Sequence, residues 1–160
     1  MQIFDLLSHI MNKGDKKTLS DVQEYGWQVL KVFEDDEGPG FAYTIGLYHT
    51  FRHPEILMIG LDIDLMSNIL NNIGGDIKTG LRYEAGKEYS EIVEHYKCSF
   101  QKIDESFYAD FLGAGMRFYQ GKPFPALQCV YPDMSGHYPW HENCNPALIE
   151  MQPLLTGTSL

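Results

Sequence analysis

Two histidines and a glutamate lie close together in YHTFRHPE, residues 48–55. His49 and His53 have the spacing of H-x-x-x-H metal sites, which requires a helix. We predict a loop instead, because strand-like apolar runs flank the segment and a proline lies within it. A histidine beside a carboxylate can accept and return a proton near neutral pH, so His53 and Glu55 are the predicted catalytic pair. The alternative is structural: Glu55 pairs with Arg52 or caps a backbone amide, and His53 stacks on a tyrosine.

A second polar cluster, YPDMSGHYPWHENCNP at residues 131–146, follows an apolar run. It combines Asp133 and Trp140 with further ionisable and aromatic side chains. A long loop of this composition is costly to order unless it packs or binds something. We predict that Asp133 and Trp140 contact a ligand. The alternative is a lid whose aromatic side chains cover one end of the core.

Metal ligation has less support in the sequence. His49, His137 and His141 are candidate ligands, but histidine in a polar loop is more often unliganded. The three cysteines are widely spaced and form no C-x-x-C pair, so neither a disulfide framework nor a cysteine-rich zinc site is indicated. We therefore assign no metal site, although a divalent metal stays open as a cofactor.

The segment GMRFY carries an arginine among apolar and aromatic residues. A guanidinium in such surroundings usually meets a carboxylate or a ligand anion. We predict that Arg117 anchors an anionic ligand and that Tyr43 and Tyr119 form aromatic walls around it. The alternative is a structural salt bridge from Arg117 to an acid such as Asp133 or Glu55.

These side chains must be positioned by regular elements, which the hydrophobic pattern predicts. Strands are predicted at 27–35, 41–48, 55–61, 88–103 (one long strand or a hairpin) and 124–133. Helices are predicted at 2–12, 20–25, 62–80 (ended or bent at Gly74 and Gly75), 106–122 and 145–155. Most connections between strands are too short for crossover helices. The pattern favours an α+β class, with a largely antiparallel sheet or an open, split-barrel-like barrel and flanking helices.

Composition bounds the class of protein. A chain of 160 residues is the usual size of one domain. Its formal net charge of −10 has the wrong sign for binding the negatively charged backbone of a nucleic acid. No run of apolar residues is long enough for a membrane span, and the first residues lack the order of a signal peptide. We expect a cytoplasmic protein that binds neither nucleic acid nor membrane.

Several blocks, FAYTIGL, HPE, ALQCVYPD, YPW and QPLL, together resemble the bacterial domain-of-unknown-function family 4262. The resemblance covers residues 22–155. Residues 1–20, an N-terminal helix and linker, lie outside it. It implies a small bacterial or phage-borne cytoplasmic domain and brings no established activity.

Taken together, the sequence predicts one pocket built from the 48–55 loop, the Arg117 helix and the 131–146 loop. We expect it to hold a small anionic molecule, in a binding protein or an enzyme. One alternative is a flavin-binding redox protein of the split-barrel class, which rests on fold analogy alone. Another is an acidic protein-interaction module without catalysis. Assembly into a homo-oligomer stays open.

Overall fold

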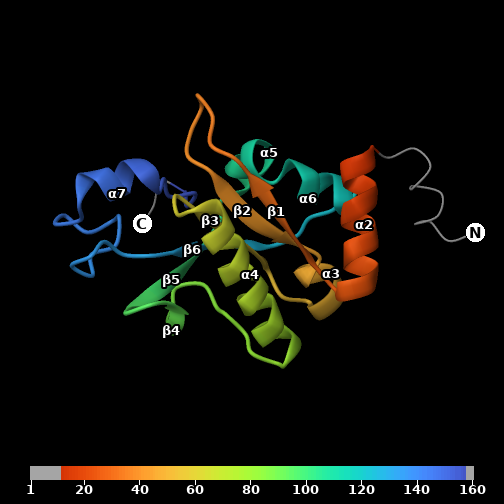
Figure 1. Cartoon of the computed structure of the whole chain (residues 1–160), viewed down its shortest axis with the longest axis horizontal. Coiled ribbons are helices and arrows are strands. Elements are labelled where there is room, and N and C mark those ends of the chain that lie inside the picture. The colour runs from red at the N-terminus through yellow and green to blue at the C-terminus, as the bar shows by residue number, and fades with distance from the viewer. Residues whose placement is uncertain (1–11, 158–160) are drawn as a thin grey trace, which may run out of the picture.

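The computed structural model describes residues 12–157, in which six strands form one open sheet (Figure 1). The strand order is β1-β2-β3-β6-β5-β4, so β1 and β4 are the edges. Neighbouring strands run antiparallel except β3 and β6, which run parallel. The strands are β1 (Gln28–Val32), β2 (Phe41–Ile45), β3 (Glu55–Ile59), β4 (Glu88–Val93), β5 (Tyr96–Lys102) and β6 (Ala126–Val130). The predicted α+β class with a largely antiparallel sheet is confirmed.

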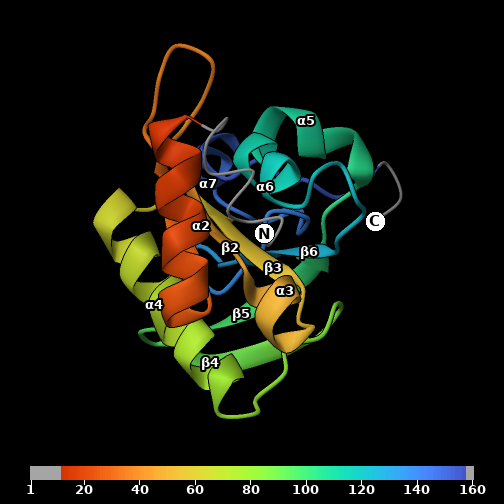
Figure 2. The same ribbon diagram turned by 90° about the vertical axis from the view of Figure 1, so that its right-hand side faces the viewer.

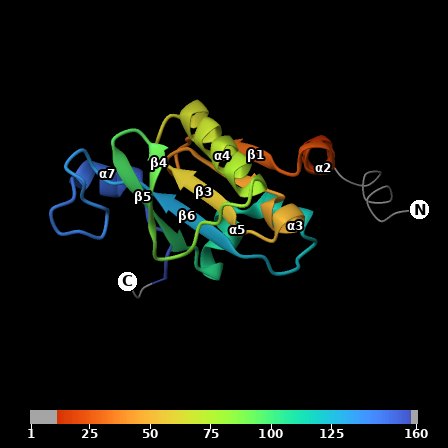
Figure 3. The same cartoon turned by 90° about the horizontal axis from the view of Figure 1, so that it is seen from below.

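Helices cover both faces of the sheet (Figure 3). One face carries α4 (Ile63–Lys78), and the other carries α5 (Tyr108–Phe111) and α6 (Gly113–Phe118). The other helices are α2 (Lys13–Tyr25), α3 (Leu47–Phe51), the 3-10 turn η1 (Glu105–Phe107) and α7 (Pro146–Met151). None of the helices in this part of the chain is long and apolar enough to cross a membrane.

Each face of the sheet buries its own apolar core. Under α4, Leu70 packs with Phe100 of β5, and both are 0% exposed. On the opposite face, Leu112 packs with Leu57 of β3 and Val22 of α2. The central strands β3 and β6 are buried along their whole length. Burial on both sides explains why their sequences do not alternate between apolar and polar residues.

Several predicted elements agree with the structure. Residues 88–103 form the β4–β5 hairpin. Asn145 caps α7, accepting the N–H of Ala147 at 3.0 Å, and Pro146 occupies its first turn. Asp62 caps α4 through the N–H of Leu65. These signals are local, so the sequence alone reveals them.

The sequence predicted that α4 ends or bends at its two glycines, but the helix does not end there. The helix continues through Gly74 and Gly75 to Lys78. Gly74 instead gives room to a neighbour, because a Cβ there would lie 2.4 Å from Cε2 of Trp27. The indole of Trp27 therefore packs directly on the backbone of α4.

The prediction that residues 48–55 form only a loop is wrong, because α3 occupies their first part. Gly46 precedes α3 with φ of 115°, a left-handed conformation that favours glycine. The proline that argued against a helix is Pro54, which follows the last turn and does not interrupt it. The carboxylate of Glu55 returns to the start of α3 and accepts its first N–H groups.

Two helix boundaries also differ from the prediction. The expected helix over 106–122 is broken into η1, α5 and α6, with the buried Leu112 at the junction. The helix expected to start at Ser20 begins earlier, because Asn12 caps α2 by accepting the N–H of Asp15 at 2.7 Å. Gly26 ends α2 as predicted. The helix predicted at 2–12 lies almost entirely outside the described residues.

Candidate functional site

Glu55 is a buried carboxylate at the start of β3, only 1% exposed. Its oxygens accept the backbone N–H groups of residues 46–48 at 2.9 to 3.3 Å. These groups open α3, so the carboxylate caps the helix. It also accepts the hydroxyl groups of Thr44, at 2.8 Å, and Tyr119. Five donors therefore converge on this one side chain.

The charge of Glu55 follows from these donors. The Thr44 hydroxyl accepts the N–H of Ile56, and the Tyr119 hydroxyl accepts the N–H of His49, so both hydroxyl protons point to Glu55. A proton on the carboxyl group would have to displace one of these hydroxyl protons, because the three backbone N–H groups cannot accept. Burial raises the pKa of Glu55, and the hydrogen bonds, first that from Tyr119, oppose the rise. The geometry fits an ionised carboxylate that joins α3 to the sheet.

His53 is buried and engaged at both ring nitrogens. Nε2 accepts the N–H of Tyr83 at 2.9 Å, and Nδ1 lies 2.8 Å from the carbonyl oxygen of Pro54. Because a backbone N–H can only donate, Nε2 is the acceptor and Nδ1 carries the proton. The ring also meets that of Tyr83 edge to face, with centroids 6.1 Å apart. His53 is therefore a neutral imidazole in this structure.

The predicted catalytic pair thus has two separate sets of partners. Glu55 faces α3 and Tyr119, whereas His53 faces Tyr83. No hydrogen bond within residues 12–157 joins the two side chains directly. Catalysis by this pair stays a prediction. The geometry supports the structural alternative, with Glu55 as a carboxylate cap and His53 packed on a tyrosine, although edge to face rather than stacked.

The burial of His53 leads to a pH dependence of stability. Burial lowers its pKa in the folded protein, so acid favours the unfolded chain, where the imidazole protonates more readily. Stability due to this group should be complete above the ordinary histidine pKa of about 6.5 and should decline below it, by at most about 1.4 kcal/mol per pH unit. Urea unfolding at several pH values between about 5 and 8 measures the decline.

The variant His53→Gln should show a shallower acid decline than the wild type. The matched control is His95→Asn at the β4–β5 turn, where the side chain is 78% exposed and asparagine tolerates the positive φ. That control should keep the slope of the wild type. Equal slopes in wild type and His53→Gln would contradict a neutral, buried His53.

Arg117 forms a bidentate ion pair with Asp15 of α2. Its Nε lies 3.0 Å from Oδ2, and its terminal nitrogen lies 3.2 Å from Oδ1. A salt bridge is therefore present, but its partner is neither Asp133 nor Glu55. Figure 2 shows how α2 and α6 lie side by side to allow this pair. Tyr43, the predicted aromatic wall, is 2% exposed, and its ring lies against Gly115 of α6.

Asp133 organises the 131–146 loop from within. Its carboxylate accepts the N–H groups of Ser135 and His137, each at 2.9 Å, and that of Asn145 at 2.8 Å. The hydrogen bond from His137 is the first cause that lowers the pKa of Asp133, which keeps the carboxylate charged. Asp133 thus holds the two ends of the loop together.

The other predicted residues of this loop stack on one another. Trp140 lies on the ring of Tyr138 with centroids 4.9 Å apart, and His137 stacks on His141 at 4.5 Å. His49 is not in this loop: it belongs to α3, and its ring meets that of Phe118 of α6 edge to face. In the part of the chain that the structure describes, no group of three or more His, Cys, Asp or Glu side chains could hold a metal ion.

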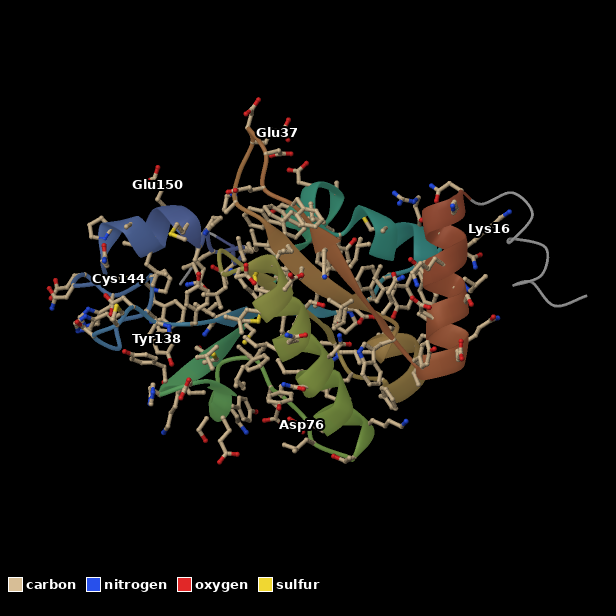
Figure 4. All side chains as sticks on the ribbon, viewed as in Figure 1. Lys16, Glu37, Asp76, Tyr138, Cys144 and Glu150 are labelled. Atoms are coloured by element: carbon tan, nitrogen blue, oxygen red, sulfur yellow. The ribbon has the colours of Figure 1, made fainter. Side chains whose placement is uncertain are left out.

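The structure does not bring the three predicted segments into one pocket. The 48–55 segment and the Arg117 helix meet through Tyr119. The 131–146 loop lies elsewhere, because β3 and β6 run parallel with Glu55 opposite Ala126. The segment before β3 and the loop after β6 are therefore at opposite ends of the sheet, about 16 Å apart over five residues of strand. Arg117 pairs with Asp15 of α2, and in Figure 4 Tyr138 of the 131–146 loop lies on the opposite side of the molecule from Lys16 of the same helix.

A different pocket lies where β3 and β6 end, which we call the carboxyl-edge pocket. Its volume is about 450 Å³. The β3–α4 segment contributes Leu61 and Leu65, and the hairpin contributes Val93, Glu94 and Tyr96. Residues 131–134 and α7 with its cap complete it, the latter through Asn145, Ala147, Leu148 and Met151. Most of the lining is apolar, as is typical of small-molecule sites.

Of the site residues predicted from the sequence, only Asp133 lines this pocket. Leu65 and Met151 could not be predicted as pocket residues, because each has the sequence surroundings of an ordinary helix residue. Their exposed fractions, 46% and 50%, are high for apolar side chains. Sequence offers little signal for such residues, because a lone exposed leucine or methionine is common on any surface.

Two buried glutamines hold α7 in place as a wall of the pocket. The side chain of Gln152 accepts the N–H of Tyr131 and donates to its carbonyl, at 3.1 and 2.8 Å. Gln128 of β6 donates to the carbonyl of Pro153 and accepts the N–H of Leu155. The side chains thus replace strand pairing and tie the C-terminal segment to β6.

Fold and pocket define an α+β domain with a six-stranded, mostly antiparallel sheet and an apolar pocket at the end of its parallel strand pair. The chain belongs to the family described as a domain of unknown function (DUF4262), whose match covers residues 21–145. No curated protein and no solved structure matches the chain.

Proposed function

We propose that this protein binds a small molecule in the carboxyl-edge pocket. The observation that carries the proposal is an apolar cavity of about 450 Å³, within the usual range for ligand sites. Ligand sites in open α/β sheets lie beyond the carboxyl ends of parallel strands, and the pocket has this position at β3 and β6. The pocket also brings together segments that are far apart in sequence, from Leu61 to Met151.

One polar group in the pocket wall supports a ligand. Tyr131 is 6% exposed, and its hydroxyl has no hydrogen-bond partner within residues 12–157. The hydroxyl lies beside Gly60 and the main chain of Met151. A buried polar group without a partner costs free energy, so its presence calls for an explanation. Because the hydroxyl is closed to solvent, a bound molecule with a hydrogen-bonding group would supply the partner once the α7 wall of the pocket moves.

A larger cavity between α2 and α4 fits the proposal less well. Its volume is about 630 Å³, and charged residues line both of its walls. Lys17 and Lys78 line it together with Asp21 and Glu24, so no single sign of charge selects a ligand. We therefore place the ligand in the smaller, apolar pocket.

A cytoplasmic location is part of the proposal and is supported by the unpaired thiols of all three cysteines.

The test is titration with N-phenyl-1-naphthylamine, an uncharged fluorophore that brightens in apolar sites. We expect saturable binding to the wild type. Leu65→Gln, which places an amide in the pocket wall, should weaken it by about tenfold, since one lost apolar contact of this size is worth 1–3 kcal/mol, roughly. Leu81→Gln is the matched control, because Leu81 is similarly exposed, 49% against 46%, and lies outside the pocket.

Two outcomes would contradict the proposal. The first is a wild type that does not bind the fluorophore, and the second is equal weakening by both variants. Flavin mononucleotide should be titrated in parallel. Saturable flavin binding that Leu65→Gln leaves unchanged would favour the redox alternative at another site.

A further inference from the structure

The two charged side chains that line the carboxyl-edge pocket are both acidic. Glu94, at the hairpin tip, and Asp133, after β6, lie in the lining, which includes no lysine, arginine or histidine. The side chain of Glu94 is 88% exposed, with the ring of His95 3.5 Å away. The protein as a whole has a formal net charge of −10. An anion would therefore enter this pocket against repulsion.

Asp133 has a fixed position and some capacity left to accept a hydrogen bond. Its Oδ1 accepts two N–H groups, from Ser135 and His137, whereas its Oδ2 accepts one, from Asn145. A carboxylate offers about two acceptor sites at each oxygen. Oδ2 therefore retains a site, and Nδ1 of His137 lies 3.8 Å from it.

We propose that the ligand of the carboxyl-edge pocket is an apolar amine in its protonated form. Its hydrocarbon body would lie against Leu61, Val93 and Leu148, and its ammonium group at the rim near Glu94 and Asp133. The inference rests on the proposed function and adds the charge of the ligand to it. It reverses the anionic ligand predicted from Arg117, which pairs with Asp15 in α2 instead.

The hydroxyl of Tyr131 suits the same class of ligand. Its oxygen can accept a hydrogen bond, and an ammonium group carries three donors. The hydroxyl is closed to solvent beside Gly60 and the main chain of Met151, so an ammonium group would reach it only if the α7 wall of the pocket moves. This position would favour an amine over a hydrocarbon of the same shape.

Three probes with one ring system and different charge test the inference. They are 1-naphthylmethylamine (cationic), 1-naphthylmethanol (neutral) and 1-naphthaleneacetate (the anionic carboxylate), each measured by displacement of N-phenyl-1-naphthylamine. We expect the amine to bind best and the carboxylate worst, with dissociation constants differing by about tenfold at low salt. The difference should shrink at high salt, because the carboxylate of Glu94 is exposed and therefore screened.

A charge-neutralising variant locates the effect. Glu94→Gln should reduce the ratio between amine and carboxylate affinities by about threefold, since it removes one rim charge. Glu37→Gln is the control, because it changes the net charge equally at the β1–β2 hairpin tip, away from the pocket (Figure 4). It should leave the ratio unchanged.

The possible failures are distinguishable. If no probe binds, the proposed function itself fails. If all three probes bind equally well, or the carboxylate binds best, a binding pocket remains and the amine inference is overturned. An unchanged ratio in Glu94→Gln, or the same reduction in Glu37→Gln, would also overturn it, because the preference would then not arise at this rim.

Discussion

Replacing Glu55 with alanine is expected to lower the free energy of unfolding by about 4 kcal/mol. The carboxylate accepts three backbone N–H groups and two hydroxyl groups in a fully buried position. Alanine would leave all five donors without their acceptor, and an unsatisfied buried donor costs roughly 1–3 kcal/mol. Relaxation of the short helix α3 would recover part of this loss. Urea denaturation followed by circular dichroism measures the change.

Two further variants separate the cap from other effects. Tyr119→Phe removes one of the five donors and should cost only about 1–2 kcal/mol. Glu37→Ala removes an exposed glutamate from the β1–β2 hairpin tip, and its effect should stay within about 0.5 kcal/mol. A Glu55→Ala protein as stable as Glu37→Ala would show that α3 does not depend on the buried carboxylate.

The second large effect is expected from Gly74→Ala in α4. A Cβ there would lie 2.4 Å from Cε2 of Trp27 and 2.7 Å from its Nε1. The indole cannot withdraw freely, because it donates to Asn71 at 3.0 Å and packs against Phe51. Overpacking usually costs about 1–3 kcal/mol, and we expect the upper end of that range despite the better helix propensity of alanine.

Gly75→Ala provides the matched comparison, one residue further along the same helix. No atom outside the helix lies within 4 Å of a Cβ built at Gly75. This variant should raise the free energy of unfolding by about 0.5–1 kcal/mol, through helix propensity alone. Equal stability of the two variants, measured by urea unfolding, would contradict close packing of Trp27 on α4.

The two stability predictions concern the scaffold, whereas the binding experiments concern the pocket. Glu55 lies at the start of β3 and the pocket lies beyond its end. A conservative change at one end, such as Tyr119→Phe, should therefore leave probe binding at the other end unchanged. The pocket depends instead on Gln152, which connects α7 to Tyr131 through two hydrogen bonds.

Much of the architecture could be predicted from the sequence because its signals are local. The buried runs at β3 and β6, the cap at Asp62 and the start of α7 at Pro146 each depend on neighbouring residues. The helix α3 could not be predicted in this way. Its first N–H groups are satisfied by Glu55, which lies beyond the end of the helix and is held there by Tyr119.

The sequence by itself determined the α+β class, the acidic charge and the presence of polar clusters around residues 53–55 and 131–146. Only the tertiary structure decided that these clusters lie at opposite ends of the sheet. The physical reason is the parallel pairing of β3 with β6, which places Glu55 opposite Ala126 across a long separation in sequence. Strand pairing of this kind depends on distant residues, and no local pattern encodes its direction.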